Sequence, residues 1–130
     1  MNIELNIGLD VAGGENGEQM QNLRANRAIA LLQASVFCNR IIGARRGDSI
    51  SEPTLIVQLG VASGSENRAK REIELISELL QQDCIAWYNA TDYTGALLGP
   101  KSAAWGEFNP EYFLRFDANK PQALILKKVA

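Results

Sequence analysis

Planar rings gather in the last third of the chain, where they would suit the binding of a flat ligand. Eight of the nine aromatic residues lie between positions 87 and 116, and Phe37 is the only other one. A ring that stacks on a nucleobase contributes roughly 1 to 3 kcal/mol. Polar neighbours that could read base edges or ribose hydroxyls are Asn89, Thr91, Asp92 and Thr94. The alternative is that these rings bury area in a segment with little regular structure.

Arginine is the second candidate binding group, because its planar fork matches phosphate oxygens two at a time. Six arginines lie outside the most charged predicted helix: Arg24, Arg27, Arg40, Arg45, Arg46 and Arg115. Arg24 and Arg27 are three residues apart on a predicted helix, so they share a face that an oligomer would repeat around its axis. Scattered surface arginine is the alternative for each of them.

Several classes of chemistry are excluded by composition. The chain has no histidine, which removes imidazole-dependent triads and histidine-zinc sites. Cys38 and Cys84 are 46 positions apart without a CxxC motif, so we expect small core residues and no metal or cofactor. A net charge of -2 provides no overall positive field, so binding to a nucleic-acid duplex is not expected.

Three motifs are set aside. Gly99 to Ser102 resembles the end of a phosphate-binding loop, but Pro100 separates its glycine from its lysine. Gly60 and Gly64 are typical of a plain strand-to-helix connection. The carboxylates have no spacing that defines a metal site or an acid/base pair: Asp48, Glu52, Asp92, Glu107 and Glu111.

Hydrophobic periodicity predicts an α+β fold. Alternation over residues 2–11 predicts a strand, and Asn16 with Gln19 predicts a capping box for a helix over about 17–34. Strands over 36–46 and 54–62 are expected to form a hairpin, followed by a helix that Ser63 and Glu66 cap and that ends near residue 82. A strand over 84–88 completes a β-α-β-β-α-β order, the ferredoxin-like arrangement of a sheet flanked by two helices.

The last forty residues are predicted to form a short C-terminal β appendage. Short strands are expected over 94–98, 112–116 and 123–129, with one helical turn that Asn109 and Pro110 begin. The length of 130 residues favours a single domain, with a core over 1–90 and the appendage over 91–130. The N-terminus lacks a targeting pattern and no stretch is apolar enough to span a membrane, so we expect a cytoplasmic protein.

Four segments, NIELNIGLD, EPTLIVQLGV, LLQQDCIAWYN and GEFNPEYFLRF, together resemble the first-described type of phage Thoeris anti-defence signal sponge. The resemblance covers most of the chain in order, through short segments and general layout. It implies a protein without enzymatic activity that sequesters cyclic ADP-ribose isomers in the host cytoplasm. It also implies assembly as a dimer or a trimer of dimers, and some hexamers of the family hold cyclic trinucleotides at separate sites. It also implies a pocket between subunits, with Arg24 near the trinucleotide position.

If the resemblance holds, the wall of this pocket is the region from Trp87 to Thr94 together with the strand from Phe113 to Phe116. Competition with a receptor requires nanomolar binding, about -12 kcal/mol, and two rings with two phosphate contacts supply only about 7 to 10 kcal/mol. A closed pocket in an obligate homo-oligomer would make up the difference. The candidate binding residues are Arg24, Arg27, Trp87, Tyr88, Asn89, Thr91, Tyr93, Phe113 and Arg115.

Two other function classes stay open. A small nucleotide-processing enzyme would use carboxylate or arginine chemistry and would form a product. A structural or protein-binding module would present the aromatic patch to another protein, and nucleotides would not raise its melting temperature.

Overall fold

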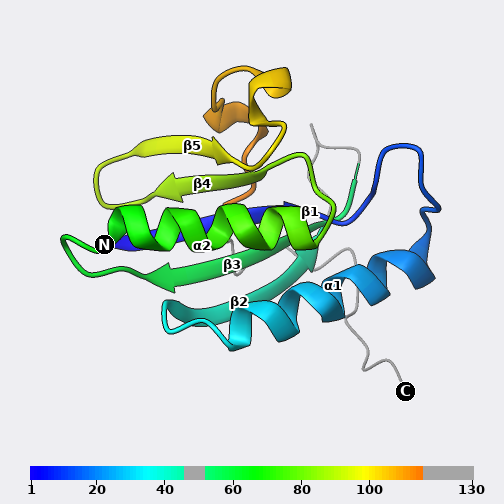
Figure 1. The fold of residues 1–130 in the computed structure, drawn as a ribbon, viewed down its shortest axis with the longest axis horizontal. Helices are drawn as coiled ribbons and strands as arrows, with labels where there is room; N and C mark the ends of the chain where they lie inside the picture. Colours follow the sequence, from blue (N-terminus) through cyan, green and yellow to red (C-terminus); the bar gives the residue numbers. More distant parts are fainter. Residues whose placement is uncertain (46–51, 116–130) are drawn as a thin grey trace.

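Two helices lie on one face of a five-stranded antiparallel sheet (Figure 1). The computed structural model describes residues 1–45 and 52–115, and it describes 38–45 as backbone only. Along the chain the elements are β1 (Asn2–Gly8), α1 (Glu18–Gln33), β2 (Cys38–Arg45), β3 (Thr54–Gly60), α2 (Glu66–Leu79), β4 (Ile85–Asn89), β5 (Thr94–Leu98) and the 3-10 turns η1 (Ser102–Trp105) and η2 (Pro110–Tyr112). The strand order is β2-β3-β1-β4-β5.

The α+β prediction, an antiparallel sheet with two helices, is confirmed, and β2 and β3 pair as expected. Strand β1 alternates as the sequence indicates: Ile3, Leu5 and Ile7 face the helices. In β3 their Cα partners are Leu59, Val57 and Leu55, which are fully buried. Removing this shared apolar surface from water is the main force that holds the sheet against the helices.

The helices close that core with their small and branched residues. Helix α1 buries Ala25, Ala28 and Leu32, whereas α2 buries Ala69 and Ile73 together with Ile76 and Ser77. Alanines let each helix approach the sheet closely, and the larger side chains of the strands fill the space between the layers. Among the described residues, no helix is both long and apolar enough to cross a membrane.

The C-terminal segment packs against the opposite face of the sheet. Phe108 and Phe113 contact Tyr88 of β4, with ring centroids 5.9 and 5.5 Å from that of Tyr88. Gly95 of β5 makes room for this packing, because a Cβ atom there would overlap the Phe108 ring. The amide of Asn6 donates to Leu114 O at 2.9 Å and accepts from Leu114 N at 2.7 Å. The segment is therefore held to the sheet by both apolar and polar contacts.

The two predicted capping boxes are wrong, although both helices form close to the predicted ranges. Helix α1 begins after Gly17 without a side-chain cap, and Asn16 instead bonds to the backbone of Val11. The N-cap of α2 is Ser65, which also makes no capping hydrogen bond. In both cases the expected capping residue lies in the preceding loop, outside the helix.

The C-terminal appendage is only partly as predicted. Strand β5 and the 3-10 turn are confirmed, with Asn109 accepting a hydrogen bond from Glu111 N at 3.0 Å. The expected strand over 112–116 is wrong in its described part, because Tyr112 ends η2 and residues 113–115 pair with no strand. These residues bond instead to the side chains of Asn6 and Glu4. The predicted strand over 123–129, with Phe116 and Arg46, lies outside the described residues.

Candidate functional site

A cavity of about 400 Å³ lies at the end of the sheet where β1 ends and β4 begins. This volume falls within the range of small-molecule pockets, about 300 to 1,000 Å³. Residues from six stretches of the chain line it, including Asp10, Glu52, Asp83, Trp105 and Tyr112. Both rings are exposed, Trp105 to 63% and Tyr112 to 60%. Flat apolar surfaces therefore border a cavity rich in hydrogen-bond acceptors.

Asp10, in the loop that follows β1, contacts the Glu52 carboxylate through its backbone. Asp10 donates its backbone N–H to Glu52 Oε2 at 3.0 Å, and its own carboxylate accepts a hydrogen bond from Gln21 at 2.7 Å. The Glu52 carboxylate packs directly against Gly8, where a Cβ atom would overlap it. Burial raises the pKa of Glu52 above its ordinary value. The Asp10 charge raises this pKa further, whereas the Asp10 hydrogen bond and Arg24 lower it.

On another wall of the cavity, Asp83 accepts a hydrogen bond from Trp105 Nε1 at 3.0 Å, which orients the indole. Cys84, beside it, is half-buried rather than a core residue, and it lines the cavity. Burial raises the pKa of the Cys84 thiol, and the charges of Asp83 and Glu52 raise it further. Since the thiolate is the nucleophile, this environment makes Cys84 a poor one near neutral pH.

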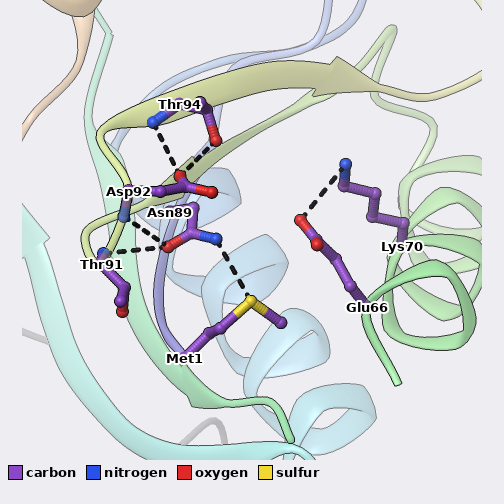
Figure 2. A network of polar contacts seen from close by, with 7 residues as sticks. All are labelled: Met1, Glu66, Lys70, Asn89, Thr91, Asp92 and Thr94. Atoms are coloured by element: carbon purple, nitrogen blue, oxygen red, sulfur yellow. Dashed lines mark hydrogen bonds and ion pairs between the residues drawn. The ribbon is translucent and has the colours of Figure 1, made fainter. Parts of the chain in front are cut away.

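The polar residues of the predicted site build the turn between β4 and β5 at the opposite end of the sheet (Figure 2). Asn89 Oδ1 accepts from the backbone N–H groups of Thr91, at 2.9 Å, and Asp92, at 3.3 Å. Asp92 accepts in turn from the backbone and the hydroxyl of Thr94. Thr91 Oγ1 accepts from Asn2 N at 3.1 Å. These side chains therefore stabilise the turn itself.

Two candidate binding residues are buried inside the protein, which corrects the expectation that they line a pocket. Trp87 is 1% exposed and belongs to the core on the helix side of the sheet, with Lys70 Nζ 5.7 Å from its ring centroid. Asn89 is fully buried, and its amide donates to Met1 Sδ at 3.4 Å (Figure 2). On a strand, odd-numbered residues from 85 to 89 face the helices, so the aromatic pair at 87 and 88 is split between the two faces.

Tyr88, Phe113 and Arg115 come together as predicted, but in a packed cluster. Tyr88 and Phe113 are 9% and 8% exposed. Arg115 forms an ion pair with Glu4 Oε2 at 2.7 Å, and its guanidinium carbon lies 4.7 Å from the Tyr88 ring centroid. The Glu4 side chain is 3% exposed, so this arginine compensates a buried charge.

Arg24 and Arg27 do not act as a pair. Arg24 donates to Leu9 O at 2.9 Å and Asn16 Oδ1 at 2.7 Å, and also to Glu15 O, so it closes the loop between β1 and α1. Arg27 is exposed on α1. Of the other candidates, Thr91 and Tyr93 are exposed, and Tyr93 adopts a φ of 63° at 79% exposure.

Sequence reasoning missed the cavity because its residues come from distant positions. Asp10 directly follows the strand β1, and Glu52 precedes β3, its antiparallel neighbour. Such neighbours bring the end of one strand beside the start of the other, so carboxylates at these two places were a usable signal. Nothing local links them to Trp105 and Tyr112, which join the site through the packing of the C-terminal segment.

Comparisons with models of known protein families, with curated proteins and with solved structures find no match. Among the described side chains, those of residues 1–37 and 52–115, no cluster of three or more His, Cys, Asp or Glu could hold a metal ion. The site must therefore be interpreted from its own geometry.

Proposed function

We propose that this protein binds a small cyclic nucleotide of the cyclic ADP-ribose class and holds it without chemical change. The observation that carries this proposal is the cavity of about 400 Å³ bordered by the exposed rings of Trp105 and Tyr112. It accords with the resemblance to phage Thoeris anti-defence signal sponges. Sequestration would keep the signal from its receptor in the host cytoplasm and so counteract the defence.

The chemistry of the cavity suits the nucleoside part of such a ligand. Each exposed ring that stacks on a base contributes about 1 to 3 kcal/mol. Carboxylates and the amides of Gln81 and Gln82 offer partners for ribose hydroxyls and for the edge of a base. These contacts together fall short of nanomolar affinity. A closed homo-oligomer, a dimer or trimer of dimers, is therefore part of the proposal.

The finer fold assignment is also a proposal. We infer a ferredoxin-like core from the order β2-β3-β1-β4, in which every neighbouring pair is antiparallel and β1 lies between β3 and β4. Strand β5 extends this sheet beyond β4. The core would hold Asp10, Glu52 and Asp83 at the shared end of β1 and β4, and the C-terminal segment adds Trp105 and Tyr112.

A nucleotide-processing enzyme is the second candidate, and Glu52 is the observation that favours it. Its burial and raised pKa are features of a general acid or base in a cleft. Burial also raises the pKa of the Cys84 thiol, so Cys84 offers no thiolate near neutral pH, and binding without turnover is the better supported function.

The deciding experiment incubates the pure protein with cyclic ADP-ribose isomers, removes free ligand, denatures the protein and identifies what is released by mass spectrometry. Intact ligand in stoichiometric amount is expected. Trp105→Ala and Tyr112→Ala should each release much less, whereas Tyr93→Ala, an exposed ring outside the cavity, should release as much as the unaltered chain.

Three results would contradict the proposal. A released product of altered mass would establish an enzyme, and Glu52→Gln should then abolish its formation. Absence of any retained nucleotide, without a rise in melting temperature, would favour the structural or protein-binding module. Equal loss in Tyr93→Ala and Trp105→Ala would move the site away from the cavity.

A further inference from the structure

We propose that the cavity takes the uncharged nucleoside half of its ligand and keeps phosphate groups at its mouth. This inference rests on the proposed function, and it names the part of the ligand that the site recognises. Two observations carry it: the described ionisable groups that line the cavity include carboxylates but no cation, and the exposed rings of Trp105 and Tyr112 border it.

Among the described residues, every charged side chain that lines the cavity is acidic: Asp10, Glu52 and Asp83 line it, and no described lysine or arginine does. Arg24 acts on the Glu52 charge, but its guanidinium is bound to Leu9, Glu15 and Asn16. A phosphate in this cavity would meet negative charges without a cation to neutralise them. Ribose hydroxyls and an exocyclic amine, in contrast, would donate to these carboxylates.

A neighbouring hollow supplies the cation that the cavity lacks. This hollow, of about 390 Å³, shares Gln81, Gln82 and Asp83 with the cavity and adds the exposed Lys101 beside Glu78. The backbone N–H of Lys101 donates to Asp83 O at 3.0 Å, so the lysine is anchored at the boundary between the two. A nucleoside inside the cavity would thus direct its phosphate toward Lys101.

The orientation of the rings supports the same assignment. The indole N–H of Trp105 is already used by Asp83, so its hydrogen-bonding edge is directed at the protein. Tyr112 completes the aromatic border. With its N–H engaged, the Trp105 indole would recognise a base by stacking on its face, which needs no charge on the ligand.

The test compares adenosine, AMP and inorganic phosphate as probes by calorimetry, alone and in competition with the cyclic ADP-ribose isomer that the protein retains. Adenosine is expected to bind at least tenfold more tightly than AMP and to displace the cyclic nucleotide. Asp83→Asn and Glu52→Gln should narrow the gap between adenosine and AMP. Glu74→Gln, on the exposed face of α2, is the matched control and should leave the gap unchanged.

Lys101→Ala separates the two halves of the ligand. The Lys101 ammonium offsets part of the repulsion between a phosphate and the carboxylates, so its loss should weaken binding of both AMP and the cyclic nucleotide severalfold while binding of adenosine stays the same. Melting temperatures of all variants check that each is folded. If Glu52→Gln does not fold, Asp83→Asn alone tests the difference in affinity between adenosine and AMP.

The outcomes distinguish this inference from the function on which it rests. Retention of the cyclic nucleotide without competition by adenosine would overturn the inference alone. Binding of AMP or inorganic phosphate more tightly than adenosine would also overturn it. Choline serves as a further probe, and its tight binding in place of adenosine would overturn the inference too, because the cavity would then be a site for organic cations. Absence of any retained cyclic nucleotide would instead refute the proposed function.

Discussion

The two ends of β1 and β4 hold similar side chains but use them differently. At the end near Asn2, the polar groups of the turn between β4 and β5 bond to one another and to the backbone. At the end near Gly8, carboxylates and amides from separate segments surround a cavity. Both regions contain aromatic residues, Tyr93 in the turn and Trp105 with Tyr112 at the cavity. The difference is that the first region satisfies its own hydrogen bonds, whereas the second leaves space for a ligand.

This comparison teaches that residue type alone does not identify a site. Asn89, Asp92 and Thr94 are the residues that nucleotide sites use, yet here they fix the geometry of a turn. Trp105 and Tyr112 are ordinary rings in an irregular segment, yet they remain exposed beside open volume. The predictions below test each side of the comparison.

The largest effect is expected from Trp87→Ala. Its ring is buried beneath the helices, so truncation should lower the free energy of unfolding by about 3 to 5 kcal/mol. Trp87→Phe, which keeps most of the packing, is the milder control. Denaturant unfolding measures both. Little loss of stability in Trp87→Ala would mean that the ring is not a core residue and would return it to the list of ligand contacts.

Arg115→Met should lower the free energy of unfolding by about 2 kcal/mol. The Glu4 carboxylate is buried and loses an ion-pair partner, but the half-exposed arginine end of the pair moderates the cost. A double-mutant cycle with Glu4→Gln isolates the coupling. If the two substitutions are additive, the pair does not hold the C-terminal segment to the sheet.

Trp105→Ala and Tyr112→Ala should each weaken ligand binding about tenfold and change stability little. A stacked ring contributes about 1 to 3 kcal/mol, and both side chains are mostly exposed in the free protein. Calorimetric titration gives the affinity, and thermal unfolding gives the stability. The same substitution at Tyr93, at the other end of the sheet, should leave binding unaltered, and a loss there would reverse the comparison.

The fold was more predictable than the site, for a physical reason. Strands and helices follow from local alternation, as in Ile3, Leu5 and Ile7, because each periodic face must be buried. The turn at Asn109 and Pro110 followed from local capping chemistry. The N-cap of α1 was mispredicted because the polar groups of Asn16 bond to the loop backbone at Val11.

The site depends on long-range packing that no local pattern encodes. Predicted and observed sites share the same stretch of aromatic residues, but alternation on β4 sends Trp87 to the core and Tyr88 to the opposite face. Phe113 packs on Tyr88, so the exposed rings of that stretch are Tyr93, Trp105 and Tyr112. Glu52 and Asp10 meet because antiparallel pairing joins the ends of β1 and β3.

Glu52 predicts a distinctive dependence of stability on pH. Because burial raises its pKa in the folded state above the ordinary value of 4.5, the folded protein binds more protons than the unfolded chain in the interval between these two pKa values. Stability from this group is present below 4.5 and is lost as pH rises through the folded pKa. Denaturant unfolding at several pH values should show that Glu52→Gln gains stability relative to the unaltered chain across this interval. A constant difference would contradict a raised pKa.

The smallest effect is expected from Tyr93→Gly. Tyr93 has a φ of 63°, a conformation that costs side-chain-bearing residues but not glycine. The substitution should stabilise the fold by about 0.5 kcal/mol, because relief of the backbone slightly outweighs the greater freedom of the unfolded chain. Thermal unfolding measures it. Clear destabilisation would indicate that the exposed ring makes a contact that matters for folding.

The most direct test of the central claim uses the two tryptophans of the chain, Trp87 in the core and Trp105 beside the cavity. A nitrogen-15 NMR spectrum contains one indole N–H signal from buried Trp87 and one from exposed Trp105, and Trp105→Phe assigns them. Addition of a cyclic ADP-ribose isomer should shift the Trp105 signal strongly and leave the Trp87 signal nearly in place. A shift confined to Trp87, or no shift at saturating ligand, would contradict binding in the cavity.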